Sequence, residues 1–173
     1  AFSTDIGCRV ADIGIQVHGG MGYVEEMGVA QILRDVRVTA IYEGTNGIQA
    51  IDLIGRKLSD NGKAANGLIN EIKITSSDCS NHEDSQIKDL GNVLSKSLVC
   101  LESTLNWMLR QGDLNERLAG ATPFLKAFGL LLGANYLVKA AMKTDSLDRK
   151  SLARFYCLNI LPEMEAYATM SKS

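Results

Sequence analysis

A single carboxylate, Glu43, stands where a short apolar run meets a glycine-rich turn. Residues 40–42 before it read Ala-Ile-Tyr, and residues 44–47 after it read Gly-Thr-Asn-Gly. A carboxylate among apolar side chains loses hydration, which favours its work as a general base. We therefore interpret Glu43 as a candidate base. The alternative is a helix-capping turn whose glutamate faces solvent.

The residues after Glu43 suit a polar ligand. Gly44 leaves its N–H open for a close acceptor, and Thr45 or Asn46 is predicted to cap the helix that follows. A helix start offers further N–H groups and the positive end of the helix dipole. Three glycines at positions 19, 20 and 22 break an earlier helix, where a backbone without Cβ atoms can approach a ligand closely.

Three motifs in order carry a family resemblance. The stretches QVHGGMGYVEE (residues 16–26), LRDVRV (33–38) and IYEGTNGIQ (41–49) resemble the C-terminal catalytic region of acyl-CoA dehydrogenase flavoproteins. The run ending in LIGRKL (53–58) resembles a longer subfamily that includes 3-methylmercaptopropionyl-CoA dehydrogenases and carries an extra helical C-terminal domain. The resemblance is strong over residues 1–58.

The resemblance implies a reaction and roles for three residues. Glu43 matches the base that takes the α-proton of an acyl-CoA thioester, while the β-hydrogen leaves as hydride to FAD and a trans-2-enoyl-CoA forms. Gly44 matches the residue whose N–H contacts the thioester carbonyl and stabilises developing negative charge. Tyr42 would line the acyl pocket.

The same resemblance implies FAD as cofactor, held by two sets of residues. Thr45, Asn46 and Gly47 match positions that contact FAD, although many relatives carry Gln at the position of Gly47. Residues Gln16, Gly19 and Gly20 match a loop that touches the adenine-dinucleotide part of FAD, typically across a subunit interface. The implied partners are acyl-CoA, an electron-transfer flavoprotein as acceptor, and further copies of the chain in a dimer or tetramer.

Composition limits the function classes. The 173 residues carry a net charge of −2 with 46% hydrophobic residues, so charge gives no support to binding of nucleic acid or an anionic membrane. The richest apolar run, residues 127–134, is shorter than the roughly 20 residues of a membrane span. Four dispersed cysteines indicate reduced, mostly buried thiols. We expect a cytoplasmic protein without a metal site.

Helical periodicity dominates the chain, and the predicted fold class is all-α. Residues 1–16 and 26–38 read as helices, the first with apolar residues at positions 2, 6, 10, 13 and 17. The polar stretch of residues 75–85 reads as a linker. We therefore place the C-terminal part of the catalytic helical domain at residues 1–74 and an additional helical domain at 75–173.

The second domain is predicted to contain three long helices. A buried stripe runs from Ile87 to Met108, followed by an interruption at residues 111–113. Residues 124–142 are apolar nearly all round, with Asn135, Lys139 and Lys143 as a polar strip. The last helix, about 148–170, carries apolar residues at positions 152, 155, 158 and 161 and a kink at Pro162.

Other polar residues are predicted to have structural roles and not catalytic ones. We expect Arg34 and Asp35 to serve a structural ion pair and His18 to be a packed or hydrogen-bonded structural histidine. His82 has Cys79 and Glu83 nearby, but one Cys, one His and loose carboxylates do not close a metal site. The preferred interpretation of the segment around His82 is a solvated linker that caps the N-terminus of the next helix.

The chain reads as the C-terminal part of a longer enzyme. The family places FAD and acyl-CoA between this region and preceding domains, so we expect no catalysis from these residues alone. Two alternatives stay open. One is a non-catalytic helical assembly module, in which the apolar helices after residue 84 serve oligomerisation. The other is an acyl-CoA oxidase, which shares the proton abstraction.

Overall fold

A computed structural model describes all residues, 1–173, and contains helices and no strand, which confirms the all-α prediction. The chain divides into two compact units, Ala1–Asp52 and Leu53–Ser173. Each is described by itself. The boundary between the units precedes the predicted one at residues 74 and 75, which falls inside a helix.

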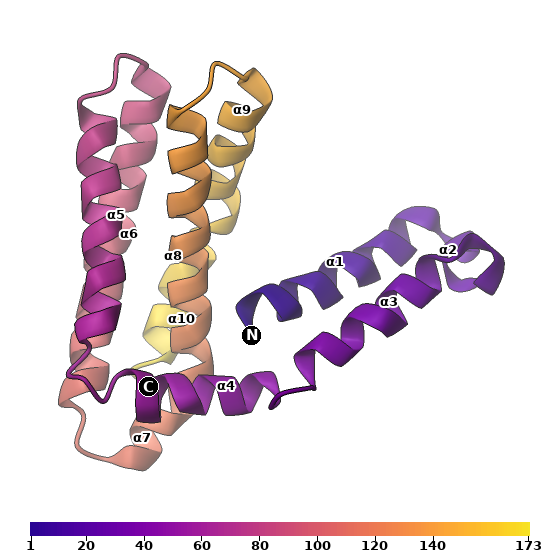
Figure 1. The fold of residues 1–173 in the computed structure, drawn as a ribbon, viewed down its shortest axis with the longest axis horizontal. Coiled ribbons are helices and arrows are strands. Elements are labelled where there is room, and N and C mark those ends of the chain that lie inside the picture. The colour runs from indigo at the N-terminus through magenta and orange to yellow at the C-terminus, as the bar shows by residue number, and fades with distance from the viewer. The chain divides into compact units, whose positions relative to one another are not determined.

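The first unit is a helical hairpin with a short third arm (Figure 1). Helix α1 runs alongside α3, and the short α2 connects their ends. A glycine in the left-handed region, Gly28 with φ of 72°, separates a 3₁₀ turn from α3, so the predicted helix at 26–38 is shorter than expected. The elements are α1 (Phe2–His18), α2 (Gly20–Tyr23), η1 (Glu25–Met27), α3 (Val29–Arg37), η2 (Val38–Ala40) and α4 (Asn46–Asp52).

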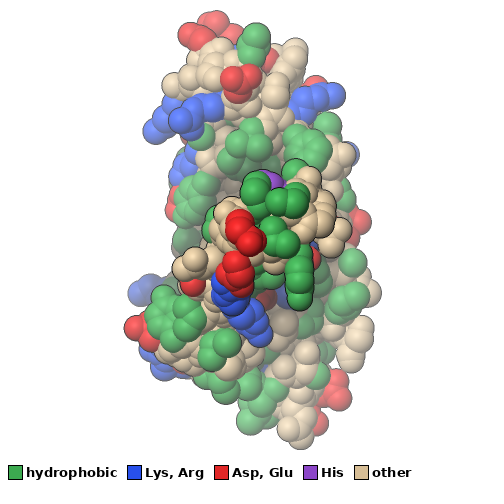
Figure 2. Space-filling model, turned by 90° about the vertical axis from the view of Figure 1, so that its right-hand side faces the viewer, with side chains coloured by type: hydrophobic (Ala, Val, Ile, Leu, Met, Phe, Trp, Pro, Cys, Tyr) green, Lys and Arg blue, Asp and Glu red, His purple; other side chains and the backbone are tan.

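The apolar stripe predicted on α1 lies open in this unit. Val10 is 62% exposed and Val17 is 78% exposed. The unit buries only Gly22, Ala40 and Ala50. Two helices side by side cover too little of each other to form a core, and hydrophobic side chains lie open between charged ones on the face shown in Figure 2.

The second unit is a bundle in which α8 is central. Helix α8 packs against α5, α6, α9 and α10, and α5 pairs with α6 along its length (Figure 1). The elements are η3 (Leu53–Lys57, a π-helix), α5 (Lys63–Ser80), α6 (Ser85–Arg110), α7 (Leu114–Ala119), α8 (Ala121–Met142), α9 (Leu147–Phe155), η4 (Tyr156–Ile160, a π-helix) and α10 (Glu163–Met170).

The core follows the predicted stripe of α6. Each apolar residue predicted to be buried on this helix is buried, from Ile87 to Met108. The predicted interruption is also confirmed, because α6 ends at Arg110 and Asp113 caps α7 by accepting from Asn115 N at 2.7 Å.

The apolar helix α8 is covered as predicted, but its polar strip is not uniform. Asn135 is fully buried. Lys139 is not simply solvated, since it forms an ion pair with Glu71 of α5. Helix α8 is long and apolar enough to cross a membrane by length and composition alone, and half of its most apolar stretch is buried in the unit.

The last helical segment buries a different face from the one predicted. Leu161 is buried, whereas Leu152, Phe155 and Leu158 are about half exposed. Three of the five buried positions of this segment carry small side chains. The five are Ala153, Cys157, Leu161, Met164 and Ala168. The helix is interrupted as predicted at Pro162, which stands before α10.

The linker interpretation of residues 75–85 is wrong for residues 75–80, which form the last turns of α5. Two of their polar side chains, those of Thr75 and Ser76, are buried and form hydrogen bonds. Ser76 Oγ donates to the carbonyl oxygen of Gly91 at 2.9 Å, and Thr75 Oγ1 donates to that of Glu71 at 3.1 Å. Composition suggested a loop because these side chains are polar, but one local hydrogen bond and one bond to α6 satisfy them inside a helix.

Candidate functional site

The Glu43 turn lies between η2 and α4 and has an unusual backbone. Glu43 adopts φ of 56° and Gly44 adopts φ of 94°. A left-handed conformation is uncommon for a residue with a Cβ, and such residues concentrate at functional sites and tight turns. The turn directs the Glu43 side chain outward, where it is exposed and has no partner in the chain. The apolar neighbours Ile41 and Tyr42 are exposed as well, so this chain alone does not supply the predicted desolvation.

A glutamine holds the turn in place. Gln49 Nε2 donates to the carbonyl oxygen of Glu43 at 2.8 Å, and a Cβ added to Gly44 would lie 3.4 Å from the same Nε2 atom. The N–H of Gly44 donates no hydrogen bond within the chain. Sequence reasoning assigned no role to Gln49, although an amide six residues after Glu43 in the IYEGTNGIQ motif was a usable signal.

Asn46 is occupied by the start of α1. Its Nδ2 donates to Asp5 Oδ1 at 2.6 Å, to Thr4 Oγ1 at 2.9 Å and to the carbonyl oxygen of Ala1 at 3.2 Å. The amide therefore fastens α1 to α4, instead of capping α4 as predicted. Its neighbours Thr45 and Gly47 are exposed, and a Cβ on Gly47 would meet nothing within 4 Å.

The second set of predicted cofactor residues lies at the other end of α1. Gly19 ends the helix with φ of 61°, and its N–H donates to the carbonyl oxygen of Gln16 at 3.0 Å. Neither Gly19 nor Gly20 has an atom within 4 Å of an added Cβ, so their backbone is open. The helix between Thr4 and Gly19 spans roughly 22 Å. The structure therefore does not bring the two sets together within the unit.

The close approach in the glycine segment is made by Gly22. A Cβ there would lie 2.5 Å from the carbonyl oxygen of Ile15, so α2 folds directly onto α1 only with glycine at this position. His18 Nδ1 lies 2.8 Å from the carbonyl oxygen of Gly14, which confirms a histidine hydrogen-bonded to its own helix.

The arginine of LRDVRV pairs with a residue other than its neighbour. Arg34 forms two hydrogen bonds with Glu25 of η1, at 3.0 and 2.8 Å, which raise the pKa of Arg34. Asp35 contributes only its charge at a distance. The expected structural ion pair is confirmed for Arg34, which joins α3 to η1 through Glu25, a residue that sequence reasoning did not single out. It is wrong for Asp35, which forms no ion pair.

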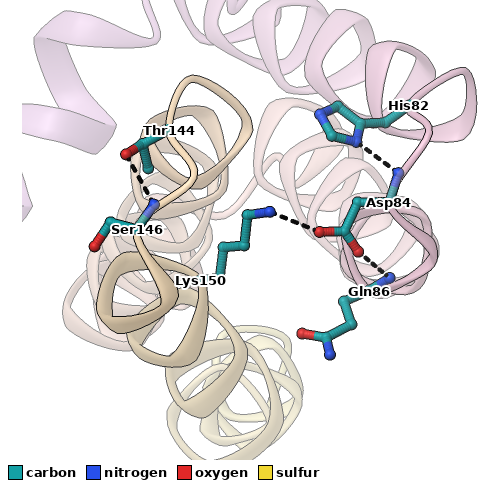
Figure 3. A network of polar contacts seen from close by, with 6 residues as sticks. All are labelled: His82, Asp84, Gln86, Thr144, Ser146 and Lys150. Carbon is teal, nitrogen blue, oxygen red and sulfur yellow. Dashed lines mark hydrogen bonds and ion pairs between the residues drawn. The ribbon is translucent and has the colours of Figure 1, made fainter.

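His82 belongs to a polar network at the start of α6 (Figure 3). Its Nδ1 accepts from Asp84 N at 3.0 Å, and Asp84 caps α6 by accepting from Gln86 N at 2.9 Å. Lys150 of α9 donates to the second Asp84 oxygen at 2.8 Å. The N-cap interpretation of this segment is confirmed, with Asp84 as the cap. No group of three or more His, Cys, Asp or Glu residues is placed to hold a metal ion.

The cysteines form no disulfide, and two of the four are buried. Burial raises the pKa of Cys79 to about 11 and that of Cys157 to about 12. These two thiols therefore remain protonated near neutral pH. Cys8 and Cys100 are half-buried.

Comparisons with known proteins agree with this layout. The profile of the acyl-CoA dehydrogenase C-terminal domain matches residues 1–59, and a profile described as acetyl-CoA dehydrogenase C-terminal like matches residues 68–173. A 3-methylmercaptopropionyl-CoA dehydrogenase of Ruegeria pomeroyi is 39% identical over 148 residues, which are 84% of this chain and 25% of that protein.

Two further relatives match only the first part. The mitochondrial very long-chain specific acyl-CoA dehydrogenase of Homo sapiens is 39% identical over 72 residues, 42% of this chain and 11% of that protein. An acyl-CoA dehydrogenase of Bacillus subtilis is 44% identical over 50 residues, 29% of this chain and 13% of that protein. The chain spans a quarter or less of the length of these relatives. With both profiles matched in order, the chain belongs to the acyl-CoA dehydrogenase family.

Proposed function

We propose that this chain is the C-terminal part of an acyl-CoA dehydrogenase and that Glu43 is the base that removes the α-proton of the substrate. The observation that carries the proposal is the Glu43–Gly44 turn. It presents a carboxylate without a partner next to an N–H without an acceptor, at the positions where the family motif has the base and the oxyanion contact.

The residues of the turn would divide the work. Glu43 takes the proton, and the N–H of Gly44 donates to the thioester oxygen, where negative charge develops as the proton leaves. Gln49 fixes the carbonyl of Glu43 and thereby the direction of the carboxylate. Tyr42, exposed beside it, would form part of the acyl-binding wall. Water exclusion around Glu43 would come from the bound acyl chain and from parts of the enzyme outside this chain.

Two segments of the chain fit FAD, and one side chain does not. The backbones at Gly19, Gly20 and Gly47 are open to close approach, whereas the amide of Asn46 is already engaged by Thr4 and Asp5. Bound FAD would supply hydride acceptance. We propose that Thr45 and the backbone of Gly47 contact it, and that Asn46 acts through positioning of α1.

The separation of the two sets supports an oligomer. Roughly 22 Å of helix lies between Asn46's partner Thr4 and Gly19, so the two sets of residues lie at opposite ends of α1. The open apolar stripe on α1 also requires a cover in the assembled enzyme. We propose a dimer or tetramer in which Gln16, Gly19 and Gly20 contact the cofactor of a neighbouring subunit, with an electron-transfer flavoprotein as acceptor.

The test is anaerobic flavin bleaching by a series of acyl-CoAs in the full-length enzyme. A Glu43→Gln variant should retain FAD and bind acyl-CoA, but bleach about 10²–10⁴-fold more slowly, since a general base contributes this much. Glu26→Gln, at an exposed glutamate outside the turn, is the matched control and should bleach normally.

Normal bleaching by the Glu43→Gln variant would overturn the proposed role of this residue. Absence of FAD from the full-length protein would favour the helical assembly module. Oxygen consumption on turnover, without need of an electron-transfer flavoprotein, would identify an oxidase in place of a dehydrogenase.

A further inference from the structure

The second unit has a shallow, open pocket of about 690 Å³ at the C-terminal end of α6, next to the residues that follow α10. Its volume lies within the range of small-molecule sites. The lining residues are Ser103, Asn106, Trp107, Arg110, Gln111 and Lys172. Four of them lie on one face of α6, since each is three or four residues from two of the others, so their side chains can act on the same ligand.

The charge of this pocket contrasts with that of the chain. Arg110 and Lys172 are its charged residues, no carboxylate lines it, and neither cation forms an ion pair. The chain as a whole is slightly acidic, with a net charge of −2. Two unpaired cations that line the same pocket, one from α6 and one from the residues after α10, suit an anion such as a phosphate.

The other lining residues add an aromatic surface and neutral hydrogen-bonding groups. Trp107 is half-buried, so part of its indole is available. Gln111 uses its side-chain oxygen to accept from Asp113 N at 3.1 Å, which leaves its NH₂ group as a donor. Ser103 and Asn106 supply a hydroxyl and an amide. An aromatic side chain beside cations is the combination that stacks a nucleobase and binds its phosphates.

From these features we propose that the pocket binds a nucleotide, with the base against Trp107 and the phosphates on Arg110 and Lys172. The inference does not rest on the proposed role of Glu43, which lies in the other unit. A free nucleoside diphosphate and the nucleotide end of a larger cofactor share this chemistry.

Binding of a phosphate in this pocket requires both Arg110 and Lys172, because the pocket lies at the C-terminal end of α6. The C-terminus of α6 carries partial negative charge on its last carbonyl groups, which repels a phosphate. Arg110 in the last turn offsets this charge, and Lys172 adds the net attraction. Removal of either side chain should therefore weaken binding by about tenfold or more.

The chain provides its own probe, since Trp107 is its only tryptophan. The experiment follows indole fluorescence of the 173-residue chain during titration with ADP, adenosine, inorganic phosphate and CoA at constant ionic strength. ADP should give a saturable change, and adenosine and phosphate should each bind at least about tenfold more weakly. If CoA binds as tightly as ADP, the ligand of the pocket is the nucleotide end of a larger cofactor. If CoA binds more weakly than ADP, the ligand is a free nucleotide.

The variants are Arg110→Ala, Lys172→Ala and, as matched control, Lys96→Ala. Lys96 is exposed on the same helix, roughly 21 Å from Arg110, and its loss should leave ADP binding unchanged. Circular dichroism shows whether each variant is folded, and calorimetry measures ADP binding independently of the indole. No saturation with ADP, equal binding of adenosine, or equal loss in the Lys96 variant would overturn the proposal.

Discussion

Gly133 of α8 lies directly against the hydroxyl group of Tyr156 in the π-helix η4. A Cβ added to Gly133 would be 2.6 Å from that oxygen and 3.1 Å from Tyr156 Cζ. The hydroxyl itself donates to the carbonyl oxygen of Leu130 at 3.2 Å. Glycine in the middle of a helix costs about 1 kcal/mol relative to alanine. The close contact with Tyr156 explains why α8 carries it.

The first prediction is that Gly133→Ala destabilises the chain, although alanine is the better helix former. The methyl group displaces Tyr156 and breaks its bond to Leu130, so we expect a net loss of about 1–2 kcal/mol. Chemical denaturation measures it. The loss should shrink when Gly133→Ala is combined with Tyr156→Phe, because the nearest atom is then absent.

A matched control is Gly67→Ala on α5, where an added Cβ meets nothing within 4 Å. This change should stabilise the chain by about 1 kcal/mol through helix propensity alone. Equal effects of the two substitutions would contradict the role assigned to Tyr156.

The second prediction concerns Asn135, whose Nδ2 and Oδ1 atoms are buried without a hydrogen-bond partner. An unpaired buried amide costs about 1–3 kcal/mol, and an apolar side chain of similar size avoids that cost. Asn135→Leu should therefore raise the free energy of unfolding by about 1–3 kcal/mol. Asn92→Leu, at an exposed position of α6, should change it by less than about 0.5 kcal/mol.

The third prediction concerns the dependence of stability on pH at Asp84. The hydrogen bond from Lys150, followed by that from Gln86 N, lowers the pKa of Asp84 below its ordinary value of 3.8. A carboxylate with a lowered folded-state pKa stabilises the fold above its ordinary pKa and loses this contribution as pH falls through the lowered value.

The melting temperature of the wild type should therefore exceed that of Asp84→Asn at pH 7. The difference should shrink as pH falls from 3.8 and vanish once pH has passed through the lowered pKa of Asp84. At the other end, Asp84 raises the pKa of Lys150 above 10.5, so the contribution of Lys150 is present below 10.5 and is lost as pH rises through the raised value. Asp89→Asn, an exposed substitution on the same helix, is the control. A pH-independent difference would show that the charge of Asp84 is not what stabilises the fold.

Apolar periodicity predicted the second unit well where one face of a helix is large and apolar. On α6 the buried stripe follows the expected spacing because a Leu-rich face has one way to leave water. On α9 and η4 the same reasoning chose the wrong face, since Ala153 and Cys157 pack inward and Phe155 lies outside. In these helices the buried face is the one that carries small side chains, and a search for large apolar side chains does not identify that face.

The turn at Glu43 was predictable from the sequence, but the surroundings of its side chain were not. The motif located the Glu43 turn, and the positive φ angles of Glu43 and Gly44 give that turn an unusual backbone. Its exposure was unexpected, because apolar neighbours in sequence bury a carboxylate only if other elements cover them. The bonds of Asn46 to α1 also lay beyond the sequence, since they join residues 41 or more positions apart.

The last prediction separates the two roles open to Asn46. If its amide mainly fastens α1, Asn46→Ala should expose the first turn of this helix, where the N–H of Asp5 donates to the carbonyl oxygen of Ala1 at 3.1 Å. Amide hydrogen exchange there should accelerate about fivefold, which corresponds to roughly 1 kcal/mol. Gln49→Ala removes the hydrogen bond that holds the Glu43 turn and does not affect the contacts of α1. This substitution should leave amide exchange in the first turn of α1 unchanged. Lower FAD affinity of the full-length Asn46→Ala enzyme with unaltered exchange would instead assign this side chain to the cofactor.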